Sequence, residues 1–153
     1  FAEFNAEWRA VRDNPLTVAI PPADVPGLRA THLHFAGAGL LVLGGVAHGI
    51  LAAEPSGEGF LTSAQREKVR DLANLDWSRT GALWKGYLVG PQGNITPHKN
   101  HIVLAVAKAK TELGLPVSAK EEAHMGRAAK TWNAESGESE LTVLSETVAA
   151  NSR

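Results

Sequence analysis

Apolar side chains recur at helical spacing in several separate stretches of this chain, and each stretch predicts a helix. The first begins at the N-terminus and stops near Asp13, because Pro15 cannot continue a helix. Its apolar positions are Phe1, Phe4, Trp8 and Val11. The other three patterns cover residues 62–73, 97–113 and 118–132.

Two of these helices begin with a capping signature. Thr62 is followed three residues later by Gln65, and this spacing predicts a capping box, in which each side chain accepts from the other residue's backbone N–H. Ser118 and Glu121 predict a second one. The residues expected to be buried are Val69, Leu72 and Ala73 in the first helix and Met125, Ala128, Ala129 and Trp132 in the second.

The helix over 97–113 has signals at both ends. Thr96 and Pro97 suit the N-cap and the first turn, and Gly114 suits the position just after the end. Its apolar stripe consists of Ile102, Val106, Ala109 and Leu113. Before this helix, the turn residues 90–93 lie between two short apolar runs, which predicts a small hairpin or a tight loop.

The longest apolar stretch runs from Phe35 to Ala53 and contains one polar side chain, His48. Its length alone would allow a membrane span. However, five glycines lower its helix propensity, and neither an aromatic belt nor a Lys/Arg cluster flanks it. We therefore expect the buried central helix of a bundle, with glycines that let neighbouring helices approach closely, and no membrane partner.

These elements together predict an all-α fold. We expect a compact single domain over residues 1–153, with five to six helices around a central glycine-rich apolar helix and at most a small β-hairpin. Residues 141–150 suit a last short helix or a partner-binding tail. Because the chain starts without Met in the middle of a helical pattern, we also expect it to be a C-terminal fragment of a longer protein.

Composition narrows the class of protein. With 44% hydrophobic and 20% charged residues, the chain should fold rather than stay disordered. A formal net charge of -1 argues against a domain that is basic throughout, as many nucleic-acid binders are. The chain has no cysteine and no signal-peptide pattern, which fits the reducing cytoplasm.

Catalytic and cofactor motifs are absent from the sequence. His98 and His101 are three residues apart on a predicted helix, but no third ligand at helical spacing completes a metal site. There is no Gly-x-Ser-x-Gly elbow and no Walker A sequence, and Gly37-Ala38-Gly39 lacks the third glycine of a dinucleotide fingerprint. We therefore expect no catalytic residue, metal or cofactor, and no enzyme activity in this chain.

Positive charge is concentrated in residues 66–110. This region has eight Lys and Arg against the three acids Glu67, Asp71 and Asp76, a formal +5 in a chain of net -1. Its cations are Arg66, Lys68, Arg70, Arg79, Lys85, Lys99, Lys108 and Lys110. Such a region suits a phosphate-contacting surface, although an ordinary set of solvated helix faces has the same pattern.

Two tryptophans, Trp77 and Trp84, lie in the same region. Aromatic rings stack on bases in proteins that bind single strands. Tryptophans beside leucines are more often core anchors whose indole N–H bonds to the backbone, and we favour that interpretation. Asp76 is placed to cap a short turn through Ser78 and Arg79.

Three short motifs lie between Leu75 and Pro116. They read Leu-Asp-Trp-Ser-Arg at 75–79, Trp-Lys-Gly at 84–86 and Leu-Gly-Leu-Pro at 113–116. This arrangement resembles the C-terminal part of the DNA sulfur-modification (phosphorothioation) protein DndB and its DGQHR-domain relatives. Leu28-Arg29 followed by the apolar run at 40–44 resembles another helix of that family, so the resemblance covers about residues 4–122.

The resemblance implies a bacterial protein whose genes accompany DNA phosphorothioation, and a DNA-binding regulator of their transcription. It also implies an N-terminal part with an Asp-Gly-Gln-His-Arg motif, which these 153 residues lack. We therefore interpret the chain as a cytoplasmic C-terminal module that contacts duplex DNA. The phosphate-contact candidates are Arg79, Lys85 and Lys99, and the structural anchors are Trp77, Trp84 and Asp76.

Two other functions remain open at this point. The chain could be a helical interaction module, whose glycine-lined helix and residues 141–150 pack against the missing N-terminal part or a second copy. It could also be the accessory half of an enzyme whose catalytic residues lie outside this chain.

Overall fold

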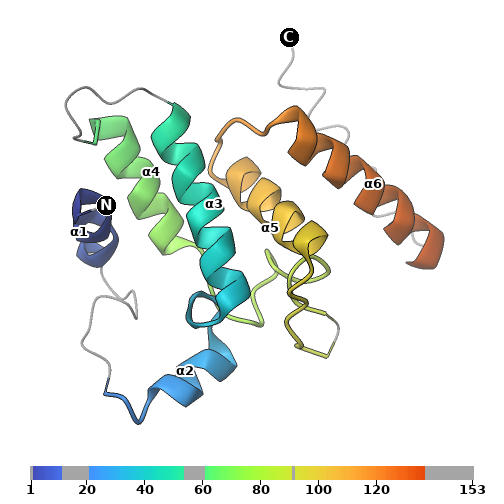
Figure 1. Cartoon of the computed structure of the whole chain (residues 1–153), viewed down its shortest axis with the longest axis horizontal. Coiled ribbons are helices and arrows are strands. Elements are labelled where there is room, and N and C mark those ends of the chain that lie inside the picture. Colours follow the sequence, from blue (N-terminus) through green and yellow to red (C-terminus); the bar gives the residue numbers. More distant parts are fainter. Residues whose placement is uncertain (1, 12–20, 54–60, 91, 137–153) are drawn as a thin grey trace. The chain divides into compact units, whose positions relative to one another are not determined.

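The computed structural model describes residues 2–11, 21–53, 61–90 and 92–136. Within them it has six α-helices, one short 3-10 helix and isolated β-bridges in place of a sheet (Figure 1). The elements are α1 (Ala2–Ala10), α2 (Val25–Thr31), the 3-10 helix η2 (Leu33–Phe35), α3 (Gly37–Ala53), α4 (Ser63–Asn74), α5 (Lys99–Glu112) and α6 (Ala119–Ser136). The predicted all-α fold is confirmed.

Some expectations lie outside the described part of the chain. They concern Phe1, the helix end at Pro15 and the helix or tail over 141–150. The side chains of Ala128, Ala129 and Trp132 are likewise not described.

The chain divides into two units, residues 1–117 and 118–153. The second unit contains α6, which opens with the predicted capping box. The Glu121 N–H donates to Ser118 Oγ (3.3 Å), and the Ser118 N–H donates to Glu121 Oε2 (2.8 Å). The single domain expected over 1–153 stays a prediction.

α3 is the central helix of the first unit and packs against both α4 and α5 (Figure 1). Its most deeply buried side chains are Val42, Val46 and Ile50. A Cβ on Gly45 would lie 2.8 Å from Val106 Cγ2, and one on Gly49 would lie 2.7 Å from Lys110 Cε. These glycines therefore let α5 approach closely, as the sequence predicted for a central glycine-rich helix.

The outer face of α3 is apolar and exposed. Leu40 is 54% exposed and Leu41 is 61% exposed, while the helix contains no charged residue. Neither this 17-residue helix nor any other in the described residues has both the length and the apolar character needed to cross a membrane.

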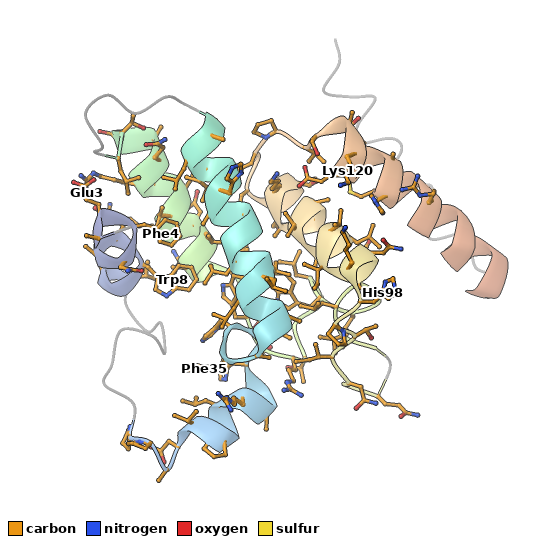
Figure 2. All side chains as sticks on the ribbon, in the orientation of Figure 1. Glu3, Phe4, Trp8, Phe35, His98 and Lys120 are labelled. Carbon is orange, nitrogen blue, oxygen red and sulfur yellow. The ribbon has the colours of Figure 1, made fainter. Side chains whose placement is uncertain are left out.

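α1 lies along α4 and contributes two aromatic residues to the core. Figure 2 shows Phe4 and Trp8 pointing from α1 toward α4. Their rings stack with centroids 6.3 Å apart, and the Trp8 ring meets the edge of Trp77 at 6.1 Å. The predicted first helix thus buries its apolar side, as the spacing of these residues indicated.

α4 has the predicted start. The Gln65 N–H donates to Thr62 Oγ1 (3.1 Å), and the Thr62 N–H donates to Gln65 Oε1 (2.9 Å). Both halves of the capping box are present, so the helix start read from the sequence is confirmed.

The start of α5 differs from the prediction. His98 is the N-cap in place of Thr96, and its Nδ1 accepts from the Asn100 N–H (3.3 Å). Thr96 belongs to the preceding hairpin instead, since its N–H donates to the Leu88 carbonyl (2.9 Å), next to an antiparallel bridge between Val89 and Ile95. This bridge closes the small hairpin expected around residues 90–93.

The end of α5 agrees with the prediction. Gly114 has a φ of 64°, and the Leu115 N–H donates to the Lys110 carbonyl (2.8 Å). This is the Schellman arrangement that a glycine after a helix permits.

Candidate nucleic-acid interface

Trp77 and Trp84 form the buried base of the region between α4 and α5. Trp77 is 4% exposed and Trp84 is 0% exposed. The indole N–H of Trp77 donates to the Leu72 carbonyl (3.0 Å), and that of Trp84 donates to the Asp76 carbonyl. Rings with so little exposed surface cannot stack on a nucleic-acid base while the fold is intact. Their role is to anchor the chain segments that pack against them.

Asp76 organises the turn between these tryptophans. Its Oδ1 accepts from the Ser78 N–H (2.9 Å), and the Gly81 N–H donates to the Ser78 carbonyl (3.1 Å). A Cβ on Gly81 would lie 2.9 Å from both the carbonyl oxygen and Oδ2 of Asp76, so the turn requires glycine there. The carboxylate thus shapes the segment from which Arg79 extends.

Arg79 is half-buried and binds the end of α2. Its backbone N–H donates to the Thr31 carbonyl (2.8 Å), and its Nη2 donates to the Arg29 carbonyl. Its Nε is buried and has no hydrogen-bond partner among the described residues. Much of this guanidinium is therefore committed to the protein rather than to solvent.

Lys85 lies on a tight turn and is exposed. The Trp84 carbonyl accepts from the N–H groups of Leu88 and Val89 (3.0 Å each), and Gly86 has a φ of 76°. The turn fixes the backbone of Lys85, which directly follows the buried Trp84. No ion pair joins its ammonium group to any described residue.

Lys99 is the first residue of α5 and is also exposed and without an ion pair to the described residues. The first turn of α5 contains no acidic residue. A cation at a helix N-terminus opposes the helix dipole, at a typical cost of about 0.3–1 kcal/mol. Helix stability therefore does not explain a lysine at this position.

The histidines beside Lys99 tie α5 to the preceding turn. The His98 and His101 rings meet edge to face with centroids 6.2 Å apart, and His101 Nδ1 lies 2.5 Å from the Tyr87 carbonyl oxygen. In the described part of the chain, no group of three or more His, Cys, Asp or Glu is placed to hold a metal ion.

The structure changes the interpretation of the basic region over residues 66–110. Two of its cations are bound by one carboxylate of α1: Arg66 Nη1 lies 2.6 Å and Arg70 Nη2 lies 2.8 Å from Glu7. Arg66 also pairs with Glu3 at 3.2 Å. The hydrogen bond from Arg66 is the main reason that the pKa of Glu7 lies below its ordinary value.

Lys68 is paired as well, with Asp71 at 3.6 Å. Residues 66–76 contain three cations and three acids and sum to zero, so the whole +5 belongs to residues 77–111, which contain five Lys and Arg and no Asp or Glu. The surface expected to contact phosphate is thus smaller than the sequence region suggested.

Not all five of these cations face solvent. Lys110 is 9% exposed and lies across Gly49 of α3, and Lys108 is half-buried. Lys85 and Lys99 are the two exposed cations of the segment.

Next to this region lies an unusual buried histidine, His34. It is 3% exposed, and neither ring nitrogen has a hydrogen-bond partner among the described residues. Its ring meets Phe35 at 4.6 Å and the edge of Trp77 at 5.9 Å. Burial, with a smaller contribution from the charge of His32, lowers the pKa of His34 to about 4.

Sequence reasoning missed the partners of the α4 arginines and the position of His34. The sequence did contain a signal for the partners of the arginines, because Glu3 and Glu7 have the same four-residue spacing as Arg66 and Arg70. No comparable pattern marks His34, since a histidine before an apolar run is ordinary.

Comparison with known proteins supports the resemblance noted in the sequence. The family model described as DndB, DNA-sulfur modification-associated, matches residues 2–116. This range is nearly the same as the first structural unit, residues 1–117, which carries Trp77, Trp84 and the acid-free segment. No curated protein and no solved structure matches the chain. Because the match covers most of its length, the chain belongs to the DndB family of proteins associated with DNA sulfur modification.

Proposed function

We propose that this chain contacts duplex DNA as the helical C-terminal module of a bacterial, cytoplasmic regulator of DNA phosphorothioation genes. Its membership of a family associated with DNA sulfur modification supports a DNA-directed role. The proposal assigns no catalytic step to the chain.

The observation that carries the proposal is the acid-free segment over residues 77–111. Its formal net charge is +5, and its exposed cations are Lys85, before the hairpin in the sequence, and Lys99, after it. Cations without neighbouring carboxylates release counterions from DNA when they bind phosphate, and this release supplies affinity for any sequence. The position of Lys99, unfavourable for its own helix, is explained if it binds a phosphate.

The proposal is tested by the salt dependence of binding. Fluorescence anisotropy with two labelled duplexes of unrelated sequence gives the association constant at several salt concentrations. Lys85→Gln and Lys99→Gln should each lower the log–log slope by about 1 for both duplexes, as expected for one phosphate contact each.

Lys68→Gln is the matched control. It removes the same charge from α4, where Asp71 already pairs with the lysine, and should leave the slope unchanged. If Lys85→Gln, Lys99→Gln and Lys68→Gln all bind like the unmodified chain, DNA binding through residues 77–111 is excluded.

A second copy of the chain is the alternative partner, and the outer face of α3 favours it. Leu40 and Leu41 are exposed beside Gly44, where no atom lies within 4 Å of the place a Cβ would take. In such a dimer the leucines of one copy would pack against the glycine of the other, and no charged side chain of α3 would be desolvated.

Light scattering distinguishes this alternative. A dimer that persists at high salt, ignores DNA and dissociates in a Leu40→Ser, Leu41→Ser variant would establish it. A monomer at all salt concentrations would exclude it.

A further inference from the structure

A second acid-free segment lies beside the first. No Asp or Glu occurs between Asp24 and Glu54, the part of the chain that contains α2, η2 and α3. An antiparallel bridge joins His32 to Ser78, and the Leu33 N–H donates to the Trp77 carbonyl (2.8 Å). The fold therefore places the end of α2 directly against the start of the segment over residues 77–111.

The cation of this second segment is Arg29, in the last turn of α2. It is exposed, and no ion pair joins it to a described residue. Helix C-termini commonly use such a cation to complement their free carbonyls. That role is already filled here, because the Arg29 carbonyl itself accepts from the guanidinium of Arg79.

Two further carbonyls near this end of α2 also have donors. The Gly27 carbonyl accepts from Thr31 Oγ1 (3.0 Å), and the Leu28 carbonyl accepts from the His32 N–H (2.8 Å). The described contacts thus leave the side chain of Arg29 without a role in capping its own helix.

We propose that Arg29 is a further phosphate-contact residue for duplex DNA, and that Arg79 is the positioning residue that fixes it. This inference rests on the proposed function. It extends the surface of Lys85 and Lys99 across the bridge between His32 and Ser78 onto α2.

The arrangement suits this division of roles. The backbone and the guanidinium of Arg79 both bind carbonyls at the end of α2, so the backbone of Arg29 is attached to the turn that follows the buried Trp77. With this backbone fixed, only the Arg29 side chain has to be ordered on binding, and its planar fork can donate two hydrogen bonds to one phosphate.

The first test is Arg29→Gln, measured by anisotropy with duplexes of unrelated sequence and with Lys68→Gln as the charge-matched control. The log–log salt slope should fall by about 1, and affinity at 0.15 M salt should fall about five-fold, since each phosphate contact scales roughly as salt to the power -0.9. The effect should be the same for both duplexes.

The salt slopes of these variants distinguish a failure of the Arg29 contact from a failure of the proposed function on which it rests. If Lys85→Gln and Lys99→Gln lower the slope while Arg29→Gln behaves like Lys68→Gln, Arg29 is excluded and the proposed function stands. If the unmodified chain shows no salt-dependent binding, both are excluded.

The role of Arg79 is tested in the presence and absence of Arg29. Arg79→Lys keeps the charge but cannot reproduce the bond geometry of the guanidinium, and circular dichroism verifies that the variant is folded. It should weaken binding in the unmodified chain and have no further effect in the Arg29→Gln variant. An additional loss in the double variant equal to that in the single one would show that Arg79 acts independently, which overturns its positioning role.

Discussion

The ring of Trp77 stacks on the ring of Trp84, with centroids 4.9 Å apart and 30° between their planes. Trp77 is bonded to the end of α4 through the Leu72 carbonyl, and Trp84 is bonded to the Asp76 carbonyl at the start of the turn. The pair therefore joins α4 to the turn that carries Lys85. Any function of that turn depends on this stacked pair.

Removal of the Trp84 ring should destabilise the fold strongly. The side chain is fully buried, and truncation of such a ring to alanine typically costs about 3–5 kcal/mol. Trp84→Phe should cost less, because it keeps a ring but loses the N–H bond to Asp76. Urea unfolding followed by far-UV circular dichroism measures both, with the exposed Leu40→Ala as control. A loss below about 1 kcal/mol for Trp84→Ala would contradict the anchoring role.

Two glycines of α3 should respond in opposite directions to alanine. A Cβ on Gly39 would lie 1.9 Å from the Leu33 carbonyl oxygen, so Gly39→Ala should destabilise by about 1–3 kcal/mol as the backbone of η2 is displaced. Gly44 has no atom within 4 Å of that position, so Gly44→Ala should stabilise by about 0.5–1 kcal/mol through helix propensity. Equal effects in thermal unfolding of the two variants would contradict the close contact between η2 and α3.

Glu7→Gln should lower the melting temperature at neutral pH, because it leaves Arg66 and Arg70 without their shared carboxylate. The pKa of Glu7 is lowered from 4.5 in the folded chain, so its charge stabilises the fold above that pH and this contribution is lost as pH falls through the folded pKa. The difference between variant and unmodified chain should therefore shrink in acid. Glu67→Gln, which changes an exposed carboxylate on α4, is the control.

Stability should also depend on His34 in a separate pH range. The pKa of His34 is about 4 in the folded chain against 6.5 for an unperturbed imidazole, so the unfolded chain binds more protons between these values. The free energy of unfolding should therefore be highest above pH 6.5 and decline as pH falls toward 4. His34→Leu should reduce the dependence of the unfolding free energy on pH in this range. His48→Gln, which removes an exposed imidazole, should not. An unchanged slope in His34→Leu would contradict a buried neutral histidine.

The sequence was sufficient where local chemistry decides the structure. The capping box of Thr62 and Gln65 and the glycine after α5 depend on residues only a few positions apart, and both were read correctly. The start of α5 was misplaced by two residues because Thr96 is part of the hairpin, where its N–H donates to the Leu88 carbonyl, and the helix begins after His98. The hairpin depends on the pairing of Val89 with Ile95, and a local helix-start pattern carries no information about such pairing.

The candidate site, too, could be predicted from the sequence only in part. The chemistry of Lys85 and Lys99 is visible in the sequence, but their exposure and lack of described carboxylate partners are not. Glu7 pairs with two arginines that lie 59 and 63 residues further along the chain, and Arg79 binds the end of α2, 50 residues before it. Such long-range contacts determine which cations remain available, and only the fold supplies them.

For the proposed DNA contact, the pairing of Glu7 with the arginines of α4 has a kinetic consequence. It leaves one flank of the first unit electrically balanced, while the flank built from α2, the hairpin and the start of α5 has an excess of positive charge. A body charged on one side rotates in the field of a polyanion before the two touch, and steering of this kind raises the rate of diffusional encounter. The carboxylate of Glu7, which lies outside the proposed contact surface, would thus help to set the direction from which the chain meets DNA.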